Sequence, residues 1–426
     1  MINKPENLCF APWTHTYLSP QTERRLCCAS REPAQNFKQY IDTSEGTNEY
    51  IPISLNEYWN SESIKRVRRQ MLNNKVPPEC VVCDKKLLNQ DVYRDYFNHL
   101  FQHKWQEVID TTDEFGNTTM QPVSWDYRFS NLCNFKCRMC GPMLSSSWET
   151  EARKNGNIEP WMEKTVKKKI ETFQQTVVEE EFSTAVENHK IEEIYWVGGE
   201  PLMYEQHWKY MQRIIELGDG PNLYARYNTN LSRIEYKGVN LYKDILANVR
   251  DWQICASIDG TGKIGEYIRT GLNYNKWHAN FVEGIRHSKN RRNMRIDFTL
   301  TLPGLFQILP ICTLAWNLNV EVLSKVTFAF TPDIAMSPLF LPKDLLTKYI
   351  DMLLLDEYVY NTKSIKEMLE SLKIRPTFEE QFPEEFAKAR LKGKWNMKAI
   401  DERRGGMCFE NTLLDKDIRK WYDSIM

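Results

Sequence analysis

Three cysteines stand within one short stretch of the chain, "RFSNLCNFKCRMCGP", at Cys133, Cys137 and Cys140. Thiolates bind soft metal centres, and a structural zinc site needs four protein ligands in a closed tetrahedron. Three thiolates in one tight loop suit three irons of a cubane iron–sulfur cluster and leave the fourth iron open to an exogenous ligand. The spacing therefore predicts a chemically active cluster.

The other cysteines also favour metal over disulfides. The chain has 11 cysteines, an odd number, and most of them are clustered. The first residues, "MINKPENLCFAPW", show no apolar segment after a basic start, so no secretory signal is expected. No run approaches the ~18 apolar residues of a membrane span. We therefore expect a cytoplasmic protein with reduced thiols, in which clustered cysteines indicate metal binding.

Length and charge limit the classes of function. At 426 residues the chain is long enough for two or three domains. Its net charge of −1 gives no field that would attract nucleic acid or an anionic membrane as a main partner. Basic runs such as "KTVKKKIE" at 164–171 are most simply solvated faces.

The residues around the three cysteines alternate between strand and helix patterns. Six segments rich in β-branched and aromatic residues predict strands, at 123–130, 191–197, 223–229, 252–258, 295–302 and 325–330. Helical candidates lie between them, and Pro310 is expected to kink or shorten the last one. Such alternation predicts an α/β fold with parallel strands joined by right-handed crossovers.

Composition divides the chain into three predicted domains. Residues 1–121 carry cysteines and aromatic residues, 122–335 hold the strand–helix alternation, and 336–426 are mainly helical. In the first region, Ser54 and Glu57 form a capping-box pattern before a helix expected to end ahead of Pro77. The role of the helical C-terminal region cannot be read from its composition.

The C-x3-C-x2-C spacing after the first strand of a (βα)6 pattern resembles the signature of the radical S-adenosylmethionine (SAM) enzymes. The resemblance covers about residues 122–335. It implies a partial (βα)6 TIM-like barrel and a 4Fe–4S cluster whose open iron chelates the amino and carboxylate groups of SAM. In that family, an electron from the cluster splits SAM into methionine and a 5′-deoxyadenosyl radical, which abstracts hydrogen from the substrate.

The resemblance also assigns expected SAM contacts. Met139 occupies the family's apolar position beside the adenine. The "GGEP" sequence follows the second strand, where Gly198 and Gly199 let backbone approach the ligand and Glu200 can accept from the SAM ammonium.

Three further positions follow later strands. Asn228 belongs to "YNTN" at the end of the third strand, where a ligand role and a plain polar turn are both open. Ser257 ends the fourth strand and is expected to contact the SAM ribose, and Arg269 is expected to meet the SAM carboxylate. For Asp259, in the same "SIDG" sequence as Ser257, a ligand role stays open.

A second cysteine set lies in the N-terminal region. "CFAPW", "RRLCC", "SLNEYWNS" and "PPECVVC" together resemble the SPASM/twitch auxiliary-cluster module of radical SAM enzymes. This resemblance implies a second 4Fe–4S cluster on four thiolates. The chosen ligands are Cys9, Cys27, Cys80 and Cys83, with Cys28 as a rival to Cys27, and a zinc ribbon is the alternative.

The second resemblance departs from the module in two ways, at Thr22, where the module usually has a turn glycine, and in lying before the barrel. A four-thiolate cluster has no open iron, so it would accept an electron from a substrate radical and favour a net oxidation.

The expected substrate is a peptide, a protein or a small molecule, and the electron donor is a flavodoxin or ferredoxin. The alternative function is a zinc-binding structural or interaction protein in which both cysteine sets are structural. Cys255, Cys312 and Cys408 are expected to be inert packing thiols.

Overall fold

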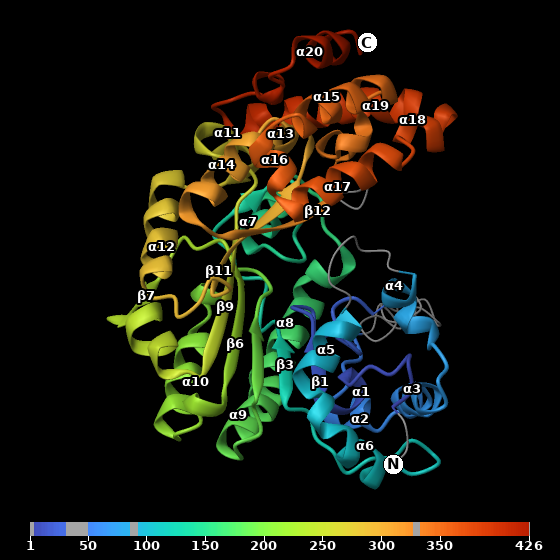
Figure 1. Ribbon diagram of the computed structural model, residues 1–426, viewed down its shortest axis with the longest axis vertical. Helices are drawn as coiled ribbons and strands as arrows, with labels where there is room; N and C mark the ends of the chain where they lie inside the picture. The colour runs from blue at the N-terminus through green and yellow to red at the C-terminus, as the bar shows by residue number, and fades with distance from the viewer. Residues whose placement is uncertain (1–3, 31–49, 86–92, 327–332, 426) are drawn as a thin grey trace. The chain divides into compact units, whose positions relative to one another are not determined.

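The computed structural model describes residues 4–30, 50–85, 93–326 and 333–425 and places them in two compact units (Figure 1). The first unit comprises residues 1–132, 149–227 and 235–252, and the second comprises 133–148, 228–234 and 253–426. The three-domain division expected from motif and composition stays a prediction.

The strands of the first unit come from both the N-terminal and the central region. β1 (His15–Leu18) lies parallel to β3 (Ser124–Tyr127), with His15 opposite Ser124. β5 (Glu193–Trp196) lies parallel to β3, and β6 (Tyr224–Thr229) parallel to β5. β2 (Arg24–Arg25) pairs antiparallel with β1. The sequence did not predict that β1 would pair with the first strand of the expected barrel.

The β1–β2 turn holds Thr22 at a φ of 66°. This is the position at which the auxiliary module usually has glycine, and the left-handed backbone explains why glycine suits it. Thr22 Oγ1 is within hydrogen-bonding distance of the Tyr50 hydroxyl, an interaction that glycine could not make.

Short helices of the first unit surround an apolar core. These helices are α1 (Ala11–Thr14), α2 (Leu55–Trp59), α3 (Glu62–Leu72), α4 (Val81–Asp84), α5 (Tyr93–Phe101) and α6 (Trp105–Thr111), whereas α10 (Glu205–Glu216) packs against α9 elsewhere in the unit. Trp13, Met71 and Phe97 are buried in the core between α1, α3 and α5. The predicted Ser54–Glu57 capping box is confirmed, but Ser61 caps a new helix, so the expected single helix is two.

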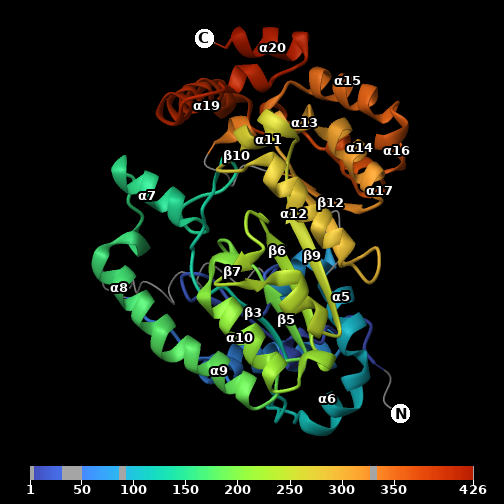
Figure 2. The same ribbon diagram turned by 90° about the vertical axis from the view of Figure 1, so that its left-hand side faces the viewer.

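The charged stretch between the first two predicted strands is helical, as expected. α8 (Lys164–Phe173) and α9 (Glu179–Glu187) follow one another through a π-helical turn, Gln174–Val178, along one side of the first unit (Figure 2).

Buried polar side chains connect neighbouring strands of the first unit. The Nδ1 atom of His15 lies 2.7 Å from the Ser124 hydroxyl, which donates in turn to Glu193. Glu193 also accepts a hydrogen bond of 2.8 Å from Tyr96 and pairs with Arg226 at 3.3 Å. A charged core of this kind is tolerated because each group has a partner.

The second unit has its own parallel strands. β9 (Asp251–Ser257), β11 (Met294–Leu300) and β12 (Glu321–Val326) pair in that order. β12 begins before the predicted strand at 325–330, of which 327–330 lie outside the described residues. The strand starts early because Asn319, in a left-handed conformation, ends the preceding helix, α14 (Ile308–Leu318). Pro310 lies in the first turn of α14, where its missing N–H does not interrupt the helix.

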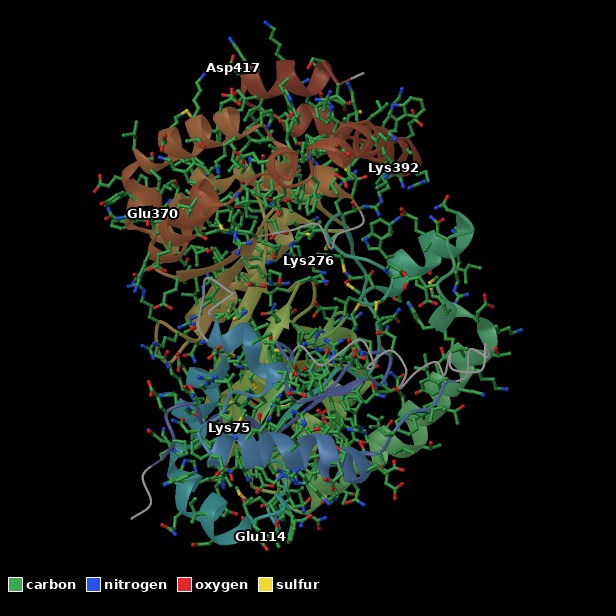
Figure 3. All side chains as sticks on the ribbon, turned by 90° about the vertical axis from the view of Figure 1, so that its right-hand side faces the viewer. Lys75, Glu114, Lys276, Glu370, Lys392 and Asp417 are labelled. Atoms are coloured by element: carbon green, nitrogen blue, oxygen red, sulfur yellow. The ribbon has the colours of Figure 1, made fainter. Side chains whose placement is uncertain are left out.

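Helices make up the rest of the second unit: α11 (Gly262–Ile268), α12 (Tyr274–Arg286), α13 (Leu302–Leu305), α15 (Lys343–Leu354), α16 (Glu357–Asn361), α17 (Lys363–Ile374), α18 (Phe378–Gln381), α19 (Pro383–Arg404) and α20 (Lys416–Asp423). Exposed charged side chains such as Glu370, Lys392 and Asp417 mark the outer surface of the last helices (Figure 3). The expected α/β class and helical C-terminal region are confirmed. In the described part of the chain, no helix is both long and apolar enough to cross a membrane.

Candidate functional site

The loop that carries Cys133, Cys137 and Cys140, the loop thiols, is held in the second unit by a short β-ribbon. β4 (Lys136–Cys137) pairs antiparallel with β10 (Arg269–Thr270), and Cys137 lies opposite Arg269. The Arg138 amide donates to the Ile268 carbonyl at 2.8 Å, and the Cys140 amide donates to the Cys137 carbonyl at 3.0 Å. These bonds fix the backbone of the loop between its second and third thiols.

The "SSS" sequence at the start of α7 (Ser146–Lys154) holds the other end of the loop. The Ser145 hydroxyl donates to the Phe135 carbonyl at 2.6 Å, and the Ser147 hydroxyl donates to the Cys133 carbonyl at 2.8 Å. The Cys133 amide donates to Ser146 Oγ at 3.1 Å. Serine hydroxyls can both donate and accept, so they join a loop backbone to a helix start.

The spacing of the thiols bears on which metal centre they could hold. Four thiolates around one zinc ion, each about 2.3 Å from the metal, lie about 3.8 Å from one another. Among the residues that the structure describes, no three thiols lie within 4.8 Å of one another. Among the described residues, the thiols are therefore not arranged at the spacing of a single bound zinc ion.

Burial raises the pKa of two of the loop thiols, Cys137 and Cys140. The pKa of Cys137 is raised to about 12, mainly by burial, although the positive charge of Arg269 acts in the opposite direction. The pKa of Cys140 is also raised by burial. Buried thiols are therefore protonated without a metal, and a metal centre must displace their protons.

Arg269 contacts Cys137 and Asp259. Its Nη1 atom lies 3.9 Å from Cys137 Sγ, its Nη2 atom 3.0 Å from Asp259 Oδ1 and its Nε atom 2.7 Å from Asp259 Oδ2. Asp259 is completely buried and also accepts from the Thr299 amide at 2.8 Å. Asp259, for which the sequence left a ligand role open, is thus the counterion of the arginine beside a loop thiol.

A second buried carboxylate, Asp297 on β11, brings two predicted SAM contacts together. The Asn228 side-chain amide donates to Asp297 at 2.8 Å, and the Ser257 hydroxyl lies 3.3 Å from the same oxygen. Lys325 pairs with Asp297 at 3.0 Å. Although burial opposes ionisation, Lys325 and the hydrogen bond from Asn228 lower the pKa of Asp297.

Sequence reasoning missed Asp297. Its only signal was an acidic residue in an otherwise apolar strand segment, "RIDFTL". Met139, the remaining expected contact of the loop, is half-buried in the turn that follows β4.

The "GGEP" sequence lies in the first unit, after β5. A Cβ atom on Gly199 would lie 2.3 Å from the Leu132 carbonyl oxygen, and Gly198 has a φ of 128°. Glycine is therefore required at both positions. The Glu200 amide donates to the Leu132 carbonyl at 2.7 Å, and the Glu200 carboxylate accepts from the Leu202 amide at 3.1 Å. This segment thus bonds to the residue that precedes Cys133 in the chain.

The second cysteine set surrounds a small cavity in the first unit. Cys9, Cys27, Cys80 and Cys83, the cavity thiols, all line it. Apolar side chains such as Leu26, Val82 and Phe97 complete the wall, together with Glu79, Tyr93 and Arg94. Four thiols around one cavity match the donor set of a cubane cluster, and equally that of a four-thiolate zinc site.

The structure separates Cys27 from its neighbour Cys28. Cys28 is absent from the cavity wall, and the groups that act on its thiol include Asp126, Arg128 and Tyr93. Burial raises the pKa of Cys9 to about 12 and that of Cys27 well above its usual range. The geometry thus groups Cys27, and not Cys28, with the other cavity thiols.

Cys255 and Cys312 are buried, as expected of packing thiols. Cys408 is exposed, so the expectation that it packs in an apolar setting is wrong. It follows the two glycines at 405 and 406 after α19, both with positive φ, which turn the chain at the surface.

Comparison with protein-family models finds no match, and comparison with curated proteins finds none either. Among solved structures, the chain is similar to native anSMEcpe with bound AdoMet and Cp18Cys peptide, at 14% identity and a TM-score of 0.34. That match covers 54% of this chain and 58% of the other. The chain is also similar to SuiB of Streptococcus suis, at 14% identity and a TM-score of 0.36, over 68% of this chain and 61% of the other.

The chain thus spans about three fifths of the length of these two solved proteins. Both are radical SAM enzymes of the SPASM/twitch type, the family that the cysteine motifs resemble. At these TM-scores the neighbours carry no argument about the site, which depends on the residues of this chain.

Proposed function

We propose that this chain is a radical SAM enzyme and that Cys133, Cys137 and Cys140 hold its SAM-binding 4Fe–4S cluster. The observation that carries the proposal is the loop itself. Three thiols lie in one buried loop, fixed by a β-ribbon and by three serines, with a guanidinium directed at one sulfur. With SAM on its open iron, such a cluster supplies one-electron cleavage of SAM and hydrogen abstraction from a substrate.

The chain's own residues would hold the cofactor in place. We assign Glu200 and the "GGEP" backbone to the SAM ammonium and Met139 to the adenine. Ser257 and Asn228 would meet the ribose, because Asp297 orients both and fixes which hydrogen bonds remain available.

Arg269 was expected to meet the SAM carboxylate. Its guanidinium instead contacts Asp259 and Cys137. We therefore propose that Arg269 acts mainly on Cys137, where a cation stabilises a thiolate ligand.

We propose a partial (βα)6 barrel around this site and a second, auxiliary 4Fe–4S cluster on Cys9, Cys27, Cys80 and Cys83. With four protein thiolates, the auxiliary centre has no open position, so it would accept an electron and favour a net oxidation. The substrate class is a peptide, a protein or a small molecule, and the reductant is a flavodoxin or ferredoxin in the cytoplasm.

Anaerobic reconstitution tests this proposal. The wild-type protein should be brown, hold about two cubanes, and with dithionite and SAM release 5′-deoxyadenosine and methionine. Replacing Cys133, Cys137 and Cys140 together by Ala should remove one cluster and all SAM cleavage. A matched triple variant with Ala at Cys255, Cys312 and Cys408 should retain both.

The competing function is a zinc-binding structural or interaction protein. Colourless protein with stoichiometric zinc after the same reconstitution would reject the enzyme proposal.

A further inference from the structure

The last turn of α19 contacts the cluster loop at two residues that flank Cys137. Arg404 donates to the Lys136 carbonyl at 2.8 Å and to Thr270 Oγ1 at 3.2 Å. Asp401 pairs with Arg138 at 2.7 Å, and both side chains are almost completely buried. One helix end therefore holds the residue before Cys137 by its backbone and the residue after it by its side chain.

Aromatic side chains complete both contacts. The Arg138 guanidinium lies 3.7 Å from the centre of the Tyr267 ring, and the Tyr267 hydroxyl donates to Asp401 at 3.0 Å. The Arg404 guanidinium lies 4.4 Å from the Trp148 ring, whose indole N–H donates to the Cys137 carbonyl at 2.7 Å. A planar guanidinium group can stack on a ring with its face while its N–H groups donate in the plane.

The spacing on α19 explains why one helix can make both contacts. Residues three apart lie on the same face of a helix, so Asp401 and Arg404 present opposite charges to the loop together. The two residues between them, Glu402 and Arg403, have the same two charges but are exposed to solvent. Substitutions of Glu402 and Arg403 therefore serve as controls for substitutions of Asp401 and Arg404.

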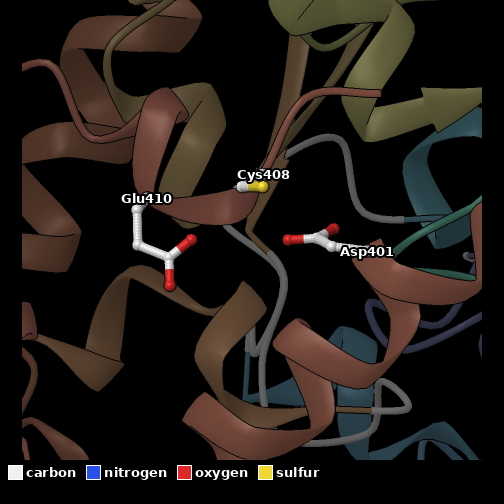
Figure 4. Close-up of side chains that lie close together, drawn as sticks. All are labelled: Asp401, Cys408 and Glu410. Carbon is white, nitrogen blue, oxygen red and sulfur yellow. The ribbon is translucent and has the colours of Figure 1, made fainter. Parts of the chain in front are cut away.

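Asp401 also lies near Cys408 and Glu410, with candidate ligand atoms within 4.8 Å of one another (Figure 4). Both carboxylate oxygens of Asp401 are already used, because Oδ1 accepts from Arg138 and Tyr267 and Oδ2 accepts from the Phe409 amide at 2.6 Å. The carboxylate is held as an anchor for Arg138, and this arrangement favours an ion pair over a metal site.

We propose that the end of α19 is a positioning element for the SAM-binding cluster, in which Asp401 and Arg404 clamp the loop on both sides of Cys137. This inference rests on the proposed function for its link to the cluster, but the clamp itself is a property of the chain alone. It gives the helical C-terminal region a role that its composition did not reveal.

The first test needs no cluster. In metal-free protein, Asp401→Asn and Arg404→Gln should each speed hydrogen exchange at the Arg138 and Cys140 amides by about tenfold, because a hydrogen bond to a charged group contributes at least that factor. Glu402→Gln and Arg403→Gln should change it by less than about twofold. Equal exchange in all four variants would reject the clamp.

The second test uses the reconstituted protein. Asp401→Asn removes a negative charge near Cys137, so the midpoint potential of the SAM-binding cluster should shift to more positive values. Adding Arg138→Gln restores the net charge and should return the potential towards that of wild type, whereas Glu402→Gln alone should not shift it. An unchanged potential in Asp401→Asn would reject the link to the cluster.

The two tests separate the two proposals. If wild-type protein takes up no iron, the proposed function fails, while the exchange test still decides the clamp. If iron and SAM cleavage are present but exchange is the same in Asp401→Asn and Glu402→Gln, the clamp fails alone. Arg404, which is half-buried, provides the variant that should fold if Asp401→Asn does not.

Discussion

The two thiol sets differ in the side chains that support them: mainly ion pairs for the loop thiols and mainly apolar residues for the cavity thiols. The loop thiols are close in sequence, and charged side chains lie around their loop. These are the ion pairs Arg138–Asp401 and Arg269–Asp259, together with Arg404. The cavity thiols come from three separate segments, and Cys9 and Cys27 belong to the apolar core of the first unit with Trp13, Met71 and Phe97.

The difference fits the roles proposed for the two sites. Charges near a cluster set its potential and orient polar ligands, so an ionic setting suits a centre that binds SAM. An apolar setting excludes water and suits a closed centre that only passes an electron. The comparison predicts that the two sites respond differently to the same class of substitution.

The largest expected effect concerns Cys27 and Cys28. With Ala at all three loop thiols, only the auxiliary cluster can form, and the protein should bind about four irons per chain. In that background Cys27→Ala should remove the iron, because Cys27 lines the cavity, and Cys28→Ala should retain it. Iron analysis and visible absorbance after reconstitution measure both, and the reverse result would contradict the grouping of the cavity thiols.

The next effect concerns the ionic support of the loop. Arg269→Met leaves Asp259 buried without its counterion and should lower the free energy of unfolding of the metal-free protein by about 3–5 kcal/mol. Adding Asp259→Asn should recover much of the loss, because an uncharged pair needs no counterion. Urea denaturation measures both variants.

The matched change in the apolar setting is Phe97→Ala. It should cost about 3–5 kcal/mol through the cavity that it leaves. A second truncation, Phe101→Ala, should add to this cost. The comparison of the two settings would be contradicted if Phe101→Ala restored stability to Phe97→Ala. It would also be contradicted if Asp259→Asn restored none to Arg269→Met.

A smaller effect concerns acid. Burial, together with the charges of Arg226 and Arg128, lowers the pKa of His15 to about 3. Below the ordinary histidine pKa of about 6.5 the unfolded chain binds a proton that the folded chain does not bind. Stability should therefore fall as the pH decreases from about 6.5 to 3, by about 2 kcal/mol at pH 5 for this one residue.

Urea denaturation at pH 7 and pH 5 measures this loss. His15→Gln should show a smaller loss between the two pH values, and the exposed His99→Gln should behave as wild type. If the free energy of unfolding depended equally on pH in all three proteins, His15 would not be buried in its neutral form.

The smallest effect concerns the helix start before the cavity thiols Cys80 and Cys83. Ser54→Ala removes the cap of α2 and should cost about 1 kcal/mol, while the cluster content stays that of wild type. Asn56→Ala, an exposed change in the same helix, is the matched control. A loss of iron in Ser54→Ala would mean that the cavity depends on local helix stability as well as on its apolar core.

The parts of this protein that its sequence determined are local. The spacing of the loop thiols predicts their common loop, because eight consecutive residues cannot separate far. Five predicted strands coincide with β3, β5, β6, β9 and β11, since β-branched and aromatic residues favour extended backbone. The Ser54 capping box was also visible, because a cap needs only four consecutive residues.

The parts that only the tertiary structure decided are contacts between distant residues. β1 pairs with β3, more than a hundred residues away in the chain, and the sequence of neither strand predicts this pairing. Cys27 and Cys28 are indistinguishable as neighbours in the chain, and only the direction of each side chain in the fold assigns one of them to the cavity. From the sequence, Arg269 was expected to bind the carboxylate of SAM. In the fold it is buried beside Asp259 and pairs with that carboxylate of the chain itself. The contact of Arg404 with Lys136 could not be predicted from the sequence either. A charged residue on a helix usually faces water, and only the packing of the chain places this one against the loop.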